Sequence, residues 1–210
     1  MIRSYRTVAR VAEVDLEVKR SIFRCRIEPV TDEATARAVI ERARAAHWDA
    51  RHHCSAFILD PAGQTARSSD DGEPAGTAGA PMLEVLRGAG VTDVVAVVTR
   101  WFGGTLLGAG GLVRAYSDAV RAGLAEAGVR HRELRAEFAV DLDHAVAGRV
   151  ESEVRARGYA VLDTTYAAQV TLRLGVPIPD TEALAATIAE LTGGAATVRP
   201  VGESWVDVPS

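Results

Sequence analysis

Lysine is nearly absent from this chain: Lys19 is the only one, against 23 arginines. A Walker phosphate-binding loop requires a Gly-Lys-Ser/Thr ending, so the missing lysine excludes that class of nucleotide site. Cysteine is almost as scarce. Because Cys25 and Cys54 stand alone, with no CxxC or zinc-finger spacing, we expect two free, buried thiols in a reducing compartment.

Long hydrophobic runs are missing as well. The first ten residues contain no apolar stretch of the kind found in signal peptides. No segment approaches the roughly 20 consecutive apolar residues of a membrane span. We therefore expect a cytoplasmic protein that does not associate with membranes.

The net charge is small, at −4 over 210 residues, and it is unevenly divided. Residues 1–133 carry a balance of +1, whereas residues 134–210 carry −5. Neither part has the strongly basic footprint of an autonomous nucleic-acid-binding domain. Any contact with a nucleic acid must therefore be local.

Hydrophobic patterns predict a mixed α+β fold for residues 1–130, which we expect to form the first domain. Alternating apolar residues predict two or three strands in the first 30 residues. The uninterrupted apolar run before Thr99 is typical of a strand buried on both faces. The other expected elements are a helix at 32–47 capped by Thr31 or Asp32, a strand at 54–59, a short helix at 81–87 and a helix from about 112 to 128.

Residues 135–210 follow a simpler order, after a polar stretch at 130–135 that we expect to be a linker. Strand and helix patterns alternate as βαββαβ, which is the ferredoxin-like arrangement. Thr181 is expected to cap the second helix of this domain. Gly158 and Gly193 fall where helices commonly end.

Five of the nine residues at 103–111, a segment that we call the glycine loop, are glycine: Gly103, Gly104, Gly108, Gly110 and Gly111. A Rossmann fingerprint is excluded because Val113 stands where its third small residue is required. Two interpretations remain. The backbone amides bind an anion or RNA phosphates, with Arg100 and Arg114 as charge partners, or the glycines form tight turns against the acidic loop at 68–79. Of Trp48 and Trp101, both expected to be partly packed, Trp101 is the better candidate for an exposed stacking ring.

The acidic loop (68–79) carries Asp70, Asp71 and Glu73. Three carboxylates could hold a hard cation, but the spacing of a calcium-binding loop is absent. We favour pairing with Arg51, Arg67, Arg100 or Arg114, or capping of the glycine-loop amides. We expect no metal and no cofactor.

His53 and Cys54 precede this loop. Adjacent His52 and His53 point to opposite faces of a strand and chelate one ion poorly. We expect that His53 can form a hydrogen bond with an aspartate of the acidic loop, and such a bond would form whether or not the protein is an enzyme. A metal-dependent or Cys/Ser hydrolase using Asp70, Asp71 and His53 or Cys54 stays open as an alternative, although no GxSxG elbow is present.

Four segments together resemble the IMPACT/YigZ family: KRSIF at 19–23, HWDARHHCSAF at 47–57, SSDDGEPAGTAGAPMLEVL at 68–86 and VVTRWFGGTLLGAGGLVRAYSDA at 97–119. The resemblance implies an N-terminal domain with the ribosomal protein S5 domain 2-like fold. It also implies a C-terminal domain similar to a ferredoxin-like domain of elongation factor G. Family members often have tyrosine in place of Trp101 and lysine in place of Leu106.

The resemblance further implies an association with the translation machinery, because eukaryotic relatives regulate translation. We therefore expect a non-enzymatic protein that binds RNA or a ribosome-associated partner, with a hydrolase and a pure protein-interaction module as alternatives. The expected binding residues combine the glycine loop, its flanks and the acidic loop: Arg100, Trp101, Gly103, Gly104, Gly108, Gly110, Gly111, Arg114, Asp70, Asp71, Glu73 and His53.

Overall fold

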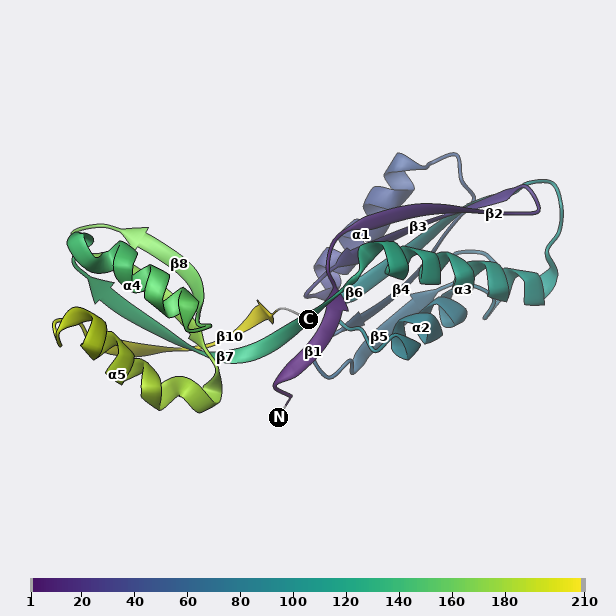
Figure 1. Ribbon diagram of the computed structural model, residues 1–210. Coiled ribbons are helices and arrows are strands. Elements are labelled where there is room, and N and C mark those ends of the chain that lie inside the picture. The colour runs from purple at the N-terminus through teal and green to yellow at the C-terminus, as the bar shows by residue number, and fades with distance from the viewer. Residues whose placement is uncertain (1, 209–210) are drawn as a thin grey trace. The chain divides into compact units, whose positions relative to one another are not determined.

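The computed structural model describes residues 2–208 (Figure 1). The chain divides into two compact units, an N-terminal unit of residues 2–131 and a C-terminal unit of residues 132–208. None of the helices in this described range is long and apolar enough to cross a membrane.

In the N-terminal unit, three strands precede alternating helices and strands. The elements are β1 (Ser4–Val8), β2 (Ala12–Val18), β3 (Ser21–Pro29), α1 (Glu33–Ala46), β4 (His52–Leu59), β5 (Thr65–Ser69), α2 (Gly79–Gly88), β6 (Val94–Trp101) and α3 (Gly108–Ala127). Strands β2 to β6 form one antiparallel sheet in the order β2-β3-β6-β4-β5. β1 is not part of this sheet.

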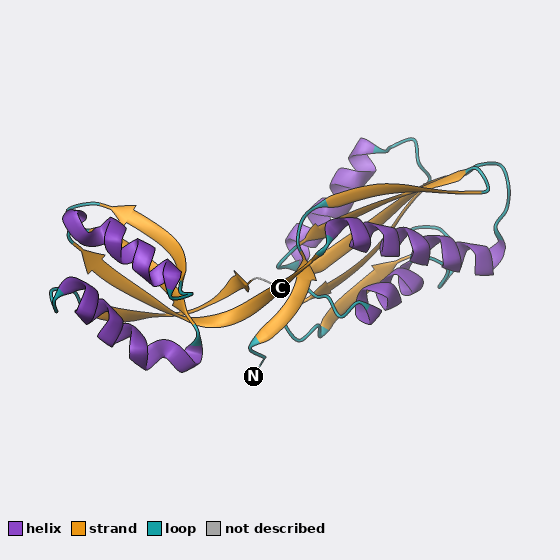
Figure 2. Ribbon diagram, viewed as in Figure 1, coloured by secondary structure: helices purple, strands orange, loops and turns teal. Residues whose placement is uncertain are grey.

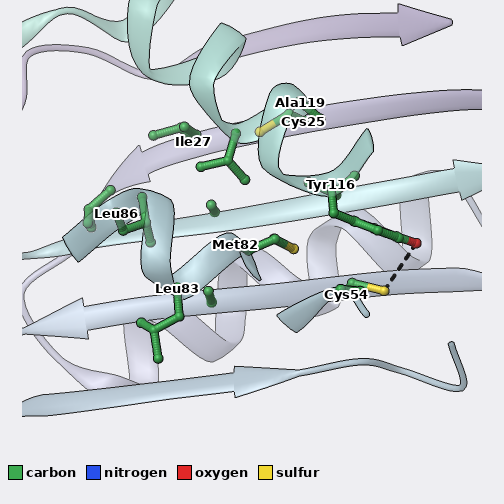
Figure 3. Packing of buried hydrophobic residues seen from close by; sticks show 14 of the residues in the cluster. Cys25, Ile27, Cys54, Met82, Leu83, Leu86, Tyr116 and Ala119 are labelled. Atoms are coloured by element: carbon green, nitrogen blue, oxygen red, sulfur yellow. Dashed lines mark hydrogen bonds between the residues drawn. The ribbon is translucent and has the colours of Figure 1, made fainter. Parts of the chain in front are cut away.

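Helices cover both faces of this sheet (Figure 2). α2 and α3 pack on one face around Phe23, Met82 and Tyr116, and Figure 3 shows part of this core. α1 packs on the other face through Val39 and Ala43. β6 is buried on both faces, as its uninterrupted apolar run predicts.

The C-terminal unit has the predicted βαββαβ order. Its elements are β7 (Val129–Leu142), whose first three residues belong to the N-terminal unit, α4 (His144–Ala156), β8 (Ala160–Tyr166), β9 (Val170–Val176), α5 (Thr181–Thr192) and β10 (Val198–Val208). β9 pairs with both β7 and β8, and β10 pairs with β7. The apolar sides of α4 and α5 share one core with this sheet. The mixed α+β class expected from the sequence is confirmed.

Two expectations about element ends are wrong. α3 begins at Gly108 rather than near residue 112, so three of the five glycines belong to its first turn. Thr181 does not cap α5 but is its first residue, and its hydroxyl donates back to the carbonyl of Ile178. Asp32 does cap α1, because its carboxylate accepts the amide of Thr35.

Two polar stretches are strands rather than irregular segments. Residues 130–135, the expected linker, lie inside β7. The five residues of β5 pair with β4 at the edge of the sheet and are mostly exposed. An exposed edge strand needs few apolar side chains, which explains why hydrophobic alternation did not predict β5.

Candidate functional site

One end of the N-terminal sheet collects the conspicuous segments of the sequence. Ile22 at the start of β3 lies opposite Trp101 at the end of β6. His52 at the start of β4 lies opposite Arg100. The β2–β3 turn and the connection from β6 to α3 therefore lie at the same end (Figure 1). We name residues 19–22 and 102–111 the glycine tip.

Gly103 brings the backbone of the connection onto the β2–β3 turn. A Cβ built on Gly103 would lie 2.0 Å from the backbone carbon of Arg20. The Gly103 amide donates to Oγ of Ser21 at 3.1 Å, and Arg20 donates to the Thr105 hydroxyl at 3.2 Å. The close approach expected of this loop is thus to residues 20–21. Gly103 does not pack against the acidic loop.

The remaining glycines leave the start of α3 open. Hypothetical Cβ atoms on Gly104, Gly108 and Gly110 meet nothing within 4 Å, whereas one on Gly111 meets Leu107 at 3.0 Å. Within residues 2–208 no side chain caps this helix, so the amides of its first turn have no side-chain acceptor there. Such amides carry partial positive charge and favour an anion.

Cationic and apolar residues lie in the segments next to these amides, on the β2–β3 turn, in the connection and on α3 itself. Lys19 and Arg114 are exposed and form no hydrogen bond or ion pair with residues 2–208. Leu106 is 83% exposed and Phe102 is 52% exposed. The glycine tip therefore combines free backbone donors, the unpaired cation Lys19 and accessible apolar side chains, and Arg114 follows it on α3.

Arg100, expected to contact a ligand, is buried. Its Nη1 donates to Oε1 of Glu73 at 2.6 Å, and the Tyr116 hydroxyl donates to the same oxygen at 2.8 Å. The guanidinium also lies 5.3 Å from the Phe23 ring centroid and 5.8 Å from that of Phe102. The expectation that the acidic loop pairs with an arginine is confirmed for Glu73. The pair attaches this loop to the sheet.

Asp70 caps backbone amides, but of a different segment from the one expected. Its carboxylate accepts the amides of Gly76, Ala78 and Gly79 at 2.8–3.0 Å, which closes the acidic loop at the start of α2. Partial burial raises the pKa of Asp70, and these amide donors outweigh that effect, so its pKa is lowered overall. The glycine-loop amides are not capped by it.

Asp71 points to the α1 side of the sheet. Its carboxylate accepts from Arg44 at 2.8 Å and from the backbone amide of His53 at 2.7 Å. The three carboxylates thus face three separate donor sets. Among residues 2–208, no group of three or more His, Cys, Asp or Glu side chains is placed to hold a metal ion.

His53 and Cys54 point to opposite faces of β4. Burial lowers the pKa of the His53 imidazole, and its Nε2 lies 3.1 Å from the carbonyl of His47, to which it can donate. Burial raises the pKa of the Cys54 thiol to about 12, and Sγ lies 3.3 Å from the Tyr116 hydroxyl (Figure 3). The hydrolase alternative therefore finds no nucleophile beside a base in these two residues.

The state of Cys54 can be tested by thiol labelling. At pH 8 a thiol with a pKa near 12 is ionised in about one molecule in ten thousand, and only the thiolate reacts readily. Both cysteines are also fully buried. We expect Ellman's reagent to label neither thiol in the folded protein and both in guanidinium chloride. Rapid labelling of one thiol in the native state would contradict this burial.

The two tryptophans near the glycine tip differ from expectation. Trp101 is half-buried, donates from Nε1 to Asp49 at 2.8 Å and packs edge-on against His47. Trp48, in contrast, is 83% exposed. Trp101 also lies on the α1 side of the sheet, because side chains alternate along a strand and Arg100 faces α3. The exposed ring is therefore Trp48.

Sequence reasoning also missed the β2–β3 turn as part of the site. Lys19 and Arg20 both have positive φ, at 49° and 66°, which fits the tight turns that join antiparallel strands. The alternating strands on either side of this pair were a usable signal for that turn. The family resemblance includes this segment but does not indicate that it lies beside the glycines.

Comparison with known proteins assigns the family. Residues 19–124 match the Impact N-terminal domain, and residues 140–195 match a domain of unknown function, DUF1949. The chain is 37% identical over 199 residues to "IMPACT family member YvyE" of Bacillus subtilis, covering 95% of this chain and 92% of that protein. It is 34% identical over 189 residues to "IMPACT family member YigZ" of Escherichia coli, covering 89% and 93%.

A solved structure agrees with this assignment. The "Crystal structure of an hypothetical protein" matches with a TM-score of 0.65 and 33% identity, over 97% of this chain and all of that one. The matched regions include both the glycine tip and the acidic loop. The chain belongs to the IMPACT family.

Proposed function

We propose that this chain is a non-enzymatic RNA-binding protein of the translation machinery, which contacts RNA phosphates through the glycine tip. The observation that carries the proposal is the uncapped start of α3, together with two unpaired cations, Lys19 on the neighbouring β2–β3 turn and Arg114 on the same helix. The association with translation rests on the family resemblance.

The chemistry of the glycine tip suits a phosphate. Free amides at a helix start donate to anions, and the helix dipole favours negative charge there. Gly104, Gly108 and Gly110 have open space where side chains would otherwise stand. A phosphate can thus reach the backbone, and Arg114 can add a charge-assisted contact. The local character of this charge agrees with the modest net charge of the whole chain.

Arg114→Glu tests the proposal. The variant places a carboxylate where a guanidinium would face a phosphate, so it is expected to bind a fluorescein-labelled oligouridine about tenfold more weakly at low salt. The slope of log K against log salt should become shallower by about one, because one fewer counterion is released. Fluorescence anisotropy over a range of potassium chloride concentrations measures both effects.

Arg10→Glu is the matched control. Arg10 is exposed and pairs with Glu126 near the other end of α3, about 27 Å along the helix from its start at 1.5 Å per residue. Arg10→Glu changes the net charge by the same amount as Arg114→Glu, but it should leave the affinity for oligouridine nearly unchanged. Equal losses of affinity in both variants would indicate non-specific attraction. A wild-type protein that binds no RNA at low salt would remove the proposal.

The exposed apolar side chains favour a second candidate, a protein-interaction module. Leu106 and Phe102 offer accessible area for a partner protein. In that case Leu106→Ser should abolish co-sedimentation with ribosomes, and the wild-type interaction should survive nuclease treatment. RNA binding predicts instead that nuclease releases the protein and that Arg114→Glu is the more damaging change.

A further inference from the structure

The loop between α1 and β4 presents a tryptophan to solvent. Trp48 is 83% exposed, although a tryptophan side chain has a large apolar area that most proteins bury at least in part. Neither a hydrogen bond nor a ring contact joins Trp48 to any residue in 2–208. This exposed ring needs an explanation.

The loop that carries Trp48 is fixed on both sides of it. The amide of Ala50 donates to the carbonyl of His47 at 3.0 Å, and the His53 ring lies 3.1 Å from the same carbonyl. On the other side, Asp49 accepts from Nε1 of Trp101 at 2.8 Å. Trp48 therefore extends from a held support. A ring whose backbone is already ordered loses less entropy when a partner covers it.

A cation accompanies the ring. Arg51 lies three residues further along the same loop, is exposed, and forms no hydrogen bond or ion pair with residues 2–208. The nearest carboxylate in sequence, Asp49, is occupied by Trp101. An exposed aromatic ring and an unpaired guanidinium on the same loop form the combination that binds single-stranded nucleic acids, in which bases stack on the ring and phosphates pair with the cation.

The loop also lies at the same end of the sheet as the glycine tip. It ends at His52, which pairs with Arg100 just before the connection to α3. β4 and β3 flank β6 on its two sides, so their ends at this edge are about 10 Å apart at the usual strand spacing. One extended ligand can thus contact both features.

We infer that Trp48 is a stacking platform for an unpaired base, which makes single-stranded RNA the ligand class of this surface, with Arg51 contacting a phosphate. This inference rests on the proposed function. A duplex keeps its base faces stacked inside and cannot offer one to Trp48, whereas a loop or a free strand can. Sequence preference is expected to be weak, because every base has a face that can stack.

The experiment compares Trp48→Ala and Trp48→Phe with the wild type. Loss of one stacked base corresponds to about a 5- to 140-fold weaker affinity, so Trp48→Ala should bind oligouridine at least fivefold more weakly. Trp48→Phe retains a ring and should keep most of the affinity. Oligouridine should also quench the tryptophan fluorescence of the wild type, and Trp48→Phe should lose most of that quenching. Affinity for a duplex RNA should be the same for all three proteins.

Tyr166→Ala is the matched control, because Tyr166 is an exposed aromatic residue of the C-terminal unit, at 71%. It should not change binding. If Trp48→Ala binds oligouridine like the wild type while Arg114→Glu binds weakly, the stacking inference is overturned and the proposed function stands. If the wild type binds no RNA, both fail. If Trp48→Ala impairs the binding of a protein partner but not the binding of oligouridine, the stacking inference is also overturned.

Discussion

Gly103→Ala is expected to destabilise the N-terminal unit by about 3 kcal/mol, the upper end of the range for overpacking. The added Cβ would lie 2.0 Å from the backbone carbon of Arg20 and 2.3 Å from the backbone nitrogen of Ser21. These are atoms of a tight turn and cannot rotate away as a side chain can. The turn or the connection must therefore shift. Urea unfolding followed by circular dichroism measures the loss, which corresponds to a lower Tm by roughly 6–12 °C.

Gly110→Ala is the control for this change. A Cβ on Gly110 meets nothing within 4 Å, and the residue lies in the first turn of α3 without a positive φ. Alanine favours a helix over glycine by up to about 1 kcal/mol, so the variant should be as stable as the wild type or slightly more stable. Similar losses of stability in the two variants would contradict the close approach of Gly103 to the turn.

Arg100→Met is expected to cost about 3–5 kcal/mol, because it leaves the carboxylate of Glu73 buried without its cation. Both side chains of the pair are at least nine-tenths buried. Methionine fills similar volume between the Phe23 and Phe102 rings, so the loss reports the charge rather than a cavity. Chemical denaturation gives the free energy of unfolding.

The double variant Arg100→Met with Glu73→Gln provides the test of this cause. Glutamine keeps the shape and can still accept from the Tyr116 hydroxyl, but it removes the unpaired charge. The double variant should therefore be more stable than Arg100→Met alone, with a coupling of at least about 1 kcal/mol. Additive losses would show that the two charges do not stabilise each other. Arg114→Glu, in contrast, should leave the free energy of unfolding nearly unchanged, because Arg114 is exposed and Arg100 is buried.

Sequence patterns predicted the elements whose formation is local. The β-branched run of β6 needs burial on both faces wherever it lies, and Asp32 caps its own helix. The βαββαβ order follows in the same way from successive patterns. The start of α3 was not predictable in this way. Glycine disfavours a helix, and packing of Leu112 and Tyr116 into the core outweighs that local preference.

The candidate site depends on contacts between distant residues. Position 103 requires glycine because a Cβ there would collide with the backbone of Arg20, which lies 83 positions earlier in the sequence. Only the strand register brings these two residues together. The sequence predicts that the carboxylates of the acidic loop accept hydrogen bonds from arginines or backbone amides. The fold determines which donor pairs with which carboxylate: Arg100 donates to Glu73, and amides at the start of α2 donate to Asp70. Likewise, Trp48 and Trp101 both lie near polar segments, and it is the tertiary contacts of Trp101 with Asp49 and His47 that hold this ring against the fold.

Backbone amide chemical-shift mapping tests the glycine tip most directly. In proton–nitrogen correlation spectra, addition of single-stranded oligouridine should shift the amide signals of Gly104, Gly108 and Gly110, and those shifts should shrink as salt is raised. The indole signal of Trp101 is expected to move less, because it already donates to Asp49. Shifts confined to the C-terminal unit, or no shifts at low salt, would contradict RNA binding by the glycine tip.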